Sequence, residues 1–343
     1  MRELLFLFDK YNCKSTDTYK RIEEAIKYTG ELLNADPAYL EQAPRLKYVF
    51  NSIRDESHDY LAHEYFNKDW IIMYFTEVLE ILQEAKLDFA CTASLSDIID
   101  ETNLTKKAQD FLNRIGHSIL REQLKDYFIS RQFRKDLYVK GLRRISKTEQ
   151  IQKLFNTTYI TLIKEPSNML LQETGITEDV YTPIIDFMQD YEPKTFINFN
   201  NQDIPAEKII EAIIILVDNG IIIPCQDLEV VDKVKNKCNN LNSYIASRSK
   251  YNDSIYVLAS PVTGGGINVS RIDMLILDQL YQGYKTIDEI TNNLWDFMDS
   301  QGQKLVEGDR TLETTEENIA KLKTKTETFF NNQFHLLKAL QII

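Results

Sequence analysis

The sequence is poor in the residues that most chemical sites require. Its 343 residues include 11 glycines, 8 prolines, 4 cysteines and 4 histidines. So few glycines and prolines exclude a collagen-like, disordered or loop-dominated chain. The cysteines form no C-x-x-C pair, and a chain of this length can bury a core without disulfides. We therefore expect reduced thiols and a cytoplasmic protein.

Metal, nucleophile and nucleotide sites all lack their sequence signatures. His58 and His63 are five residues apart, so they do not share a helical face as the zinc ligands of a helix do. We expect the histidines to bond to neighbouring backbone instead. No G-x-S-x-G elbow is present, and the one glycine cluster, 264–266, lacks the G-x-G-x-x-G spacing and is expected to form a turn between domains. We predict no metal, catalytic or cofactor-binding residue in this chain.

Long apolar runs and an excess of positive charge are also missing. The longest apolar stretch, 209–224, is interrupted by Glu211 and Asp218 and is too short to span a bilayer. The first ten residues hold five apolar side chains in a row before charges resume, so we expect neither a signal peptide nor membrane insertion. Lys and Arg total 40 against 52 Asp and Glu, a net charge of -12. This sign disfavours a protein that coats nucleic acid or anionic lipid.

Helical periodicity dominates the residues that are present. Apolar side chains recur at spacings of three and four between Trp70 and Ala85, which predicts a helix with one face in the core. Thr105 is a typical N-cap for a second helix that ends near Gly116. A third helix is predicted over 207–217.

Strand signals are fewer and shorter. Residues 159–163 and 254–259 are rich in β-branched and aromatic side chains. The predicted fold is therefore mainly α with small β elements. We expect three parts: a helical region over 1–145, a middle α+β domain over 146–265, and a winged-helix-like domain over 266–343.

Two short segments of the chain resemble each other, which supports the winged-helix expectation. Residues 185–188 followed by Lys194 resemble residues 277–280 followed by Lys285, and a longer helical stretch comes after each. Two winged-helix-like units would give this pattern, and a chance match over so few positions is the alternative.

One segment, 121–147, reverses the charge of the chain. It holds nine basic and three acidic residues, interleaved with four aromatic ones. Such a pattern can serve nucleic acid; the alternative is a helix whose aromatics enter the core while its bases meet acids elsewhere. Within it, Arg131, Arg134 and Lys135 flank Phe133, so we predict a partner-docking segment in which the charges orient and the ring anchors. The competing interpretation places Phe133 in the core and leaves the bases solvated.

Several motifs resemble one family. The matching segments are Asp36-Pro-Ala-Tyr-Leu40, Tyr60-Leu-Ala-His-Glu-Tyr65, Arg121-Glu-Gln-Leu-Lys-Asp-Tyr127, Arg131-Gln-Phe-Arg-Lys-Asp136 and Leu258-Ala-Ser-Pro-Val-Thr-Gly264. They are similar to the region that follows the catalytic domain in bacterial protein-lysine methyltransferases of the rickettsial type, and the resemblance extends over nearly the whole chain.

The resemblance implies a methyltransferase regulatory domain and a role in substrate recognition. Enzymes of that family bind S-adenosylmethionine in a Rossmann-like catalytic domain, and no position here matches its glycine loop. We therefore expect a separate catalytic domain to bind the cofactor, in a split or truncated enzyme, and this chain alone to be catalytically silent. No catalytic or cofactor residue is carried over.

The resemblance also implies partners. These are the catalytic domain, a protein substrate such as a bacterial outer-membrane protein, and a second copy in a homodimer. The alternative from another class is a non-enzymatic winged-helix-type nucleic-acid-binding or scaffold protein, which the net charge of -12 disfavours.

Overall fold

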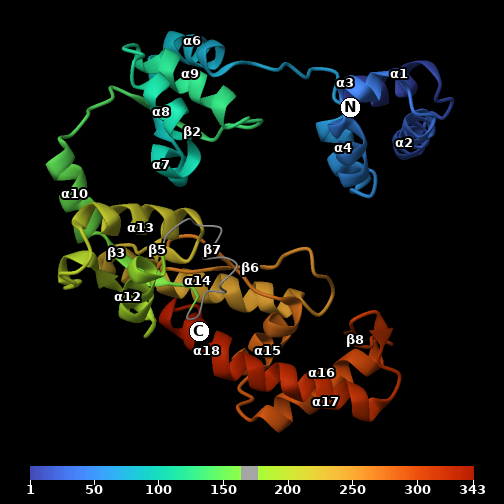
Figure 1. Cartoon of the computed structure of the whole chain (residues 1–343). Helices are drawn as coiled ribbons and strands as arrows, with labels where there is room; N and C mark the ends of the chain where they lie inside the picture. Colours follow the sequence, from blue (N-terminus) through green and yellow to red (C-terminus); the bar gives the residue numbers. More distant parts are fainter. Residues whose placement is uncertain (164–176) are drawn as a thin grey trace. The chain divides into compact units, whose positions relative to one another are not determined.

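The computed structural model describes residues 1–163 and 177–343 (Figure 1). The chain divides into two compact units, Met1–Glu77 and Val78–Ile343, and each is described by itself. In the described residues helices predominate, and the sheets have two or three strands, all paired antiparallel. The predicted class, mainly α with small β elements, is confirmed. The predicted boundaries near 145 and 265 stay predictions, as does the winged-helix assignment.

The first unit is a small bundle of short helices. Its core contains Leu5, Ile22, Ile53 and Leu61. Asp17 is the N-cap of α2, the longest helix of this unit, because its carboxylate accepts the backbone N–H of Lys20. The helices are α1 (Arg2–Tyr11), α2 (Thr18–Asn34), α3 (Tyr39–Gln42), α4 (Arg45–Ile53) and α5 (His58–Glu64).

The helix predicted from Trp70 to Ala85 is shorter in the structure. The helix α6 spans Phe75–Glu84, and it begins where the backbone N–H of Tyr74 donates to Glu77 Oε2 at 2.6 Å. Residues 70–74 are not helical, and their five apolar side chains are between 43% and 77% exposed. The guanidinium of Arg2 lies 4.6 Å above the Trp70 ring. Five consecutive apolar residues cannot share one helical face, which is why the periodic pattern holds from Phe75 onward.

A compact helical part with a two-stranded sheet follows. The strands pair antiparallel, with Leu87 opposite Lys140. Thr105 caps α8 as predicted, accepting the N–H of Ala108, although that helix ends at Leu112, before the predicted Gly116. The elements are β1 (Leu87–Thr92), η1 (Leu95–Ile98), α7 (Asp100–Asn103), α8 (Lys106–Leu112), α9 (Ser118–Phe128) and β2 (Asp136–Lys140).

The middle part is a three-stranded sheet with helices, in the strand order β4-β3-β5. The predicted helix over 207–217 is α13, and the predicted strand over 159–163 is β3. Ile184, Phe196 and Leu216 lie in the core that the sheet and helices share. The elements are α10 (Lys147–Asn156), β3 (Thr158–Thr161), α12 (Glu178–Met188), β4 (Lys194–Thr195), η2 (Phe196–Asn198), α13 (Ala206–Asp218) and β5 (Ile222–Pro224).

The C-terminal part has the largest core. Its first helix, α14, lies beside the β6–β7 hairpin, and α16 packs along α17 (Figure 1). The glycine cluster Gly264–Gly266 forms the turn of that hairpin and the start of β7, and its predicted role as a turn between domains stays a prediction. The elements are α14 (Leu228–Arg248), β6 (Val257–Ala259), β7 (Gly266–Asn268), α15 (Arg271–Tyr281), α16 (Ile287–Ser300), β8 (Val306–Glu307), β9 (Arg310–Thr311), α17 (Thr315–Thr328), η3 (Phe329–Gln333) and α18 (Phe334–Ala339).

A buried amide holds the β8–β9 hairpin to α17. Asn318 has no exposed surface; its Oδ1 accepts the N–H of Leu305, and its amide donates to the carbonyl of Leu312. Both ends of the hairpin are thereby fixed to one side chain. No helix of the described ranges has both the length and the apolar character that crossing a membrane requires.

Candidate docking site

The four predicted docking residues lie in the loop that joins α9 to β2. Ser130 adopts a left-handed conformation with φ of 51°, which turns the chain out of α9. The backbone N–H of Arg131 then donates to the carbonyl of Asp126 at 3.0 Å. The loop is therefore held at its first residue, and β2 takes over at Asp136.

Arg134 is the centre of an ionic cluster. Its guanidinium bonds to the carboxylates of Glu122 at 2.8 Å, Asp126 at 2.7 Å and Asp136 at 2.7 Å. The Arg134 side chain is 15% exposed. Burial alone would lower the pKa of Arg134, but the hydrogen bonds that its guanidinium donates to Asp136, Asp126 and Glu122 outweigh it and raise that pKa. Arg134 is thus a fixed charge that joins α9 to β2.

Arg131 extends the cluster toward η1. Its Nη2 lies 2.6 Å from Asp97 Oδ2, its Nε lies 3.2 Å from Asp126 Oδ1, and its side chain is 7% exposed. Because Asp97 belongs to η1, Arg131 connects the loop to a segment more than thirty residues earlier in the chain.

Asp100 completes the cluster at the start of α7. Lys125 Nζ lies 2.5 Å from Asp100 Oδ1 and also donates to the carbonyl of Asp97, while Arg121 pairs with the other oxygen of Asp100. Burial would raise the pKa of Asp100, but the hydrogen bonds from Lys125 and Arg121 outweigh it, and the pKa lies below its usual value. Four bases of the predicted run are therefore paired with carboxylates, and they do not form the open basic face that nucleic acid requires.

The aromatic side chains of the same run lie on the outside. Phe133 is 80% exposed, Tyr127 is 64% exposed and Phe128 is 46% exposed. The interpretation with aromatics in the core and bases meeting acids is therefore right about four of the nine bases and wrong about these rings. The competing placement of Phe133 in the core with solvated bases is wrong for Phe133, Arg131 and Arg134. Carboxylates spaced along η1, α7 and α9 bring the guanidinium groups inward, and the rings between them face solvent.

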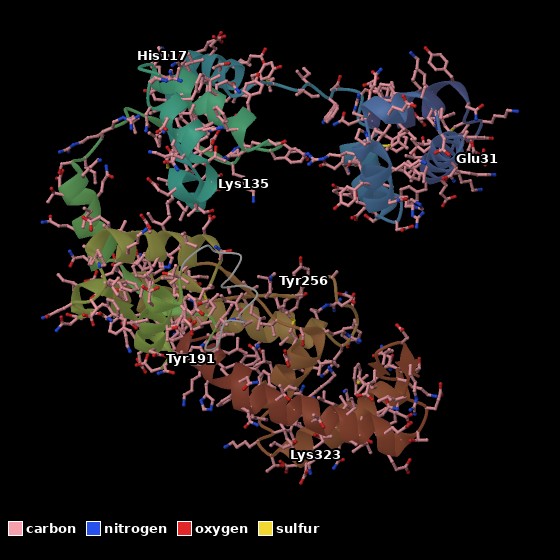
Figure 2. All side chains as sticks on the ribbon, viewed as in Figure 1. Glu31, His117, Lys135, Tyr191, Tyr256 and Lys323 are labelled. Atoms are coloured by element: carbon pink, nitrogen blue, oxygen red, sulfur yellow. The ribbon has the colours of Figure 1, made fainter. Side chains whose placement is uncertain are left out.

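Phe133 and Lys135 remain available at the surface of the loop. Lys135 is exposed, and its side chain pairs with no carboxylate of the described residues (Figure 2). The Lys135 carbonyl accepts the N–H of Ala93 at 2.6 Å, so the backbone beneath the side chain is anchored to the residue that follows β1. Of the four predicted residues, two are structural and two can meet a partner.

A second aromatic pair is exposed on α8 and at the end of α9. The Phe111 and Phe128 ring centroids are 5.7 Å apart, and the Arg114 guanidinium lies 5.7 Å from the Phe111 centroid. Aromatic and arginine side chains are enriched where proteins bind one another. Sequence reasoning missed this pair, because a Phe at helical spacing is read as a core residue.

The carboxylate of Asp218 in the middle part bonds to residues 87–140, the part that holds the loop. Asp218, the last residue of α13, accepts the backbone N–H of Leu95 at 2.7 Å and of Ser96 at 3.2 Å. These are the first N–H groups of η1, whose Asp97 holds Arg131. A displacement of α13 would therefore act directly on the segment beneath the loop.

No cluster of metal-ligating side chains occurs in the ranges 1–163 and 177–343. His117 caps α9, because its Nδ1 accepts the backbone N–H of Leu120 at 3.3 Å, as expected for a histidine that bonds to neighbouring backbone. A cavity of about 380 Å³ lies between β1 and α9, lined by Phe89, Ile119 and Arg144 among others.

Comparison with known proteins identifies relatives. Residues 57–140 match the family described as a predicted methyltransferase regulatory domain. The chain is 32% identical over 355 residues to the uncharacterized protein sll1526 of Synechocystis sp., an alignment that covers 99% of this chain and 68% of that protein. The regulatory-domain match contains the whole ionic cluster and its loop, and it bears out the methyltransferase-related family inferred from the sequence motifs.

Solved structures share the fold. PKMT2 from Rickettsia typhi in complex with AdoHcy superposes with a TM-score of 0.64 at 17% identity, over 96% of this chain and 71% of that chain. A second structure of PKMT2 gives a TM-score of 0.59 at 13% identity, over 98% and 71%.

Proposed function

Since the chain belongs to the family of sll1526 and contains a methyltransferase regulatory domain over residues 57–140, we propose that it is the regulatory and substrate-recognition portion of an S-adenosylmethionine-dependent protein-lysine methyltransferase. The observation that carries the proposal is the regulatory-domain match, because the rigid ionic cluster and the exposed loop both lie inside it. The likeness in fold to PKMT2 in complex with AdoHcy supports the methyl-transfer chemistry, since AdoHcy is what remains of S-adenosylmethionine after its methyl group has left.

In this proposal a catalytic domain binds S-adenosylmethionine. Rossmann-like folds bind nucleotide cofactors at the carboxyl ends of parallel strands, whereas the sheets described here are antiparallel and at most three strands wide. The substrate is a protein, such as a bacterial outer-membrane protein, and the assembly is a homodimer. This chain alone would be catalytically silent.

The loop of Phe133 and Lys135 is the proposed contact with the catalytic domain. Burying an exposed phenylalanine side chain contributes about 2 kcal/mol. Arg131 and Arg134 hold the loop in one conformation before it binds, so little ordering entropy is lost on association. Lys135 would orient an acidic patch of the partner.

The test uses a separately expressed catalytic domain of this family. Calorimetry should detect binding of that domain to the full chain, and Phe133→Ala with Lys135→Ala should weaken it by at least about tenfold, the equivalent of ~1.4 kcal/mol. Ile197→Ala is the matched control, because Ile197 is 61% exposed but lies outside residues 57–140.

Two results would contradict the proposal. The first is micromolar binding of S-adenosylmethionine by this chain alone in the same calorimeter. The second is unchanged binding by the Phe133→Ala, Lys135→Ala variant, which would show that contact with the catalytic domain does not depend on the loop.

A further inference from the structure

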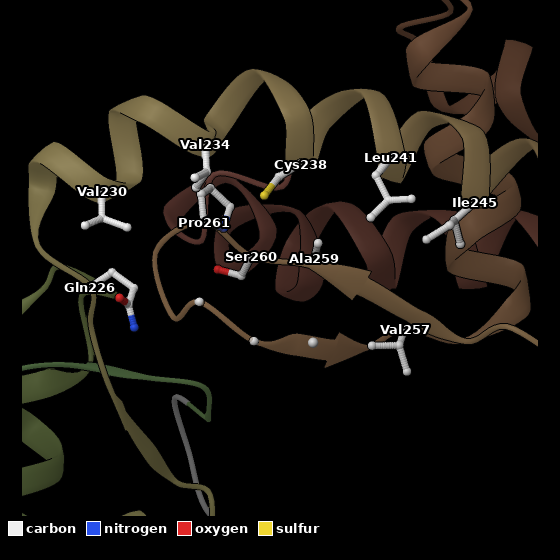
Figure 3. Close-up of a pocket in the computed structure, with 13 residues that line it drawn as sticks. Gln226, Val230, Val234, Cys238, Leu241, Ile245, Val257, Ala259, Ser260 and Pro261 are labelled. Atoms are coloured by element: carbon white, nitrogen blue, oxygen red, sulfur yellow. The ribbon is translucent and has the colours of Figure 1, made fainter.

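A groove separates α14 from the β6–β7 hairpin. Its upper wall is an apolar stripe at helical spacing, formed by Val230, Val234, Cys238, Leu241 and Ile245, and Figure 3 shows these side chains directed toward the hairpin. Leu241 is 49% exposed and Val230 is 41% exposed. The groove encloses about 680 Å³. From the first to the last side chain, four turns of helix, the stripe is roughly 22 Å long.

The floor of the groove is kept low by small residues. Val257 and Ala259 line it from β6, and Gly266 lies opposite Ala259. A Cβ on Gly266 would come within 2.3 Å of Val257 Cγ1, so the Val257 side chain occupies that space. No large side chain of the hairpin therefore fills the groove.

The hairpin is fixed to α14 by a pair of hydrogen bonds. The Asn242 amide donates to the Ala259 carbonyl at 2.9 Å, and Asn242 Oδ1 accepts the Ala259 N–H at 2.8 Å. This occupies the outer backbone edge of β6, so an added β-strand cannot pair there at Ala259. The groove is therefore suited to side chains of a helix, which packs at 8–10 Å from its neighbours.

Basic residues follow the groove along most of α14. Residues 233–248 hold Lys233, Lys235, Lys237 and Arg248, whereas the acidic residues of this helix, Glu229 and Asp232, come before them. Lys233 and Lys237 directly precede two groove residues, and neither pairs with a carboxylate within residues 1–163 or 177–343. Unpaired bases beside an apolar stripe are complementary to an acidic amphipathic helix.

We infer that this groove binds an amphipathic helix of a partner protein, with apolar side chains against the stripe and acidic side chains against Lys233 and Lys237. The inference does not depend on the methyltransferase function. The helix has about four turns, and its affinity combines burial of apolar area with ion pairs at the rim.

The experiment uses the full chain and two fluorescent peptides of about 16 residues, the length of the stripe. Both peptides carry leucines on one helical face; one has glutamates on its flanks and the other has lysines at the same positions. We expect the glutamate peptide to bind in the micromolar range and the lysine peptide at least about tenfold more weakly. The glutamate peptide should protect Cys238 from N-ethylmaleimide without protecting Cys225, which lies outside the groove.

Variants locate the binding site. Leu241→Glu should weaken binding of the glutamate peptide by at least about tenfold, and Val230→Glu provides a second test of the same wall. The affinity of the wild type for the glutamate peptide should fall as salt is added. Lys233→Glu with Lys237→Glu should weaken binding and remove this salt dependence. Val306→Glu is the control and should change nothing, because Val306 is 57% exposed on β8. Thermal melts should show that each variant remains folded.

Four results would overturn the inference. These are absence of binding to the glutamate peptide, equal binding of both peptides, binding that leaves Cys238 reactive, and sedimentation that shows a wild-type dimer dissociated by Leu241→Glu. The last result would assign the groove to a second copy of this chain.

Discussion

Replacing Arg134 with methionine should loosen the regulatory domain strongly. The change keeps much of the aliphatic stem of the side chain and removes the charge that Glu122, Asp126 and Asp136 share. Three carboxylates would then lie close together with their main counter-charge gone. Arg134→Met therefore measures how much the buried charge cluster contributes to the fold of this part.

The size of the effect follows from burial and distance. Removing one partner of a buried ion pair costs about 3–5 kcal/mol. The Glu122 side chain is 22% exposed, and Arg131 still lies 3.2 Å from Asp126, so we expect the lower end, about 3 kcal/mol. Hydrogen exchange followed by mass spectrometry on the full chain measures this loss of stability in β1 and β2 separately from the rest of the protein. Amides of β1 and β2 should exchange ~100-fold faster in Arg134→Met than in the wild type.

Lys135→Met is the matched control. It removes the same charge from the next residue, but the Lys135 side chain is exposed and pairs with no carboxylate of the described part of the chain. Its effect on exchange should stay within about 0.5 kcal/mol. Unchanged exchange of β2 in Arg134→Met would refute the reasoning.

Two further changes have defined outcomes. The lowered pKa of Asp100 stabilises the fold above its unfolded pKa of about 3.9, and this contribution is lost as pH falls through the folded value. The melting temperature of Asp100→Asn should therefore lie below that of the wild type at pH 7. A difference between the two melting temperatures that did not narrow below about pH 4 would contradict this assignment. Gly266→Ala should destabilise the C-terminal part by about 1–3 kcal/mol, because its Cβ would meet Val257 at 2.3 Å. The free energy of unfolding measured by urea titration tests this, and Gly265→Ala, whose Cβ has no neighbour closer than 3.9 Å, should lower it clearly less than Gly266→Ala.

Sequence signals within a short segment, such as a cap residue or helical periodicity, predicted the helices that they mark. The Thr105 cap and the α13 helix followed from side-chain chemistry and periodicity, and both occur with small shifts of their ends. The β1–β2 sheet was not predicted, because its strands are more than forty residues apart and β2 lies within a strongly charged segment. Long-range pairing has no local signature.

The docking segment shows the same division more sharply. The sequence placed Arg131, Phe133, Arg134 and Lys135 together, but it did not separate the two that hold the loop from the two that face solvent. That separation depends on Asp97 and on Asp126, which approach from η1 and α9. Periodicity assigns faces within one helix and does not tell which charges from other elements will meet it.

The two tryptophans of the chain lie in contrasting surroundings, and this gives the protein a built-in optical readout. Trp295 is 7% exposed in the C-terminal core, whereas Trp70 is 43% exposed in the apolar segment between α5 and α6. Their emission should therefore contain a blue-shifted component from Trp295 and a red-shifted one from Trp70. Iodide should quench the Trp70 component first. A ligand that covers residues 70–74 would then be visible without any label, separately from unfolding of the core around α16.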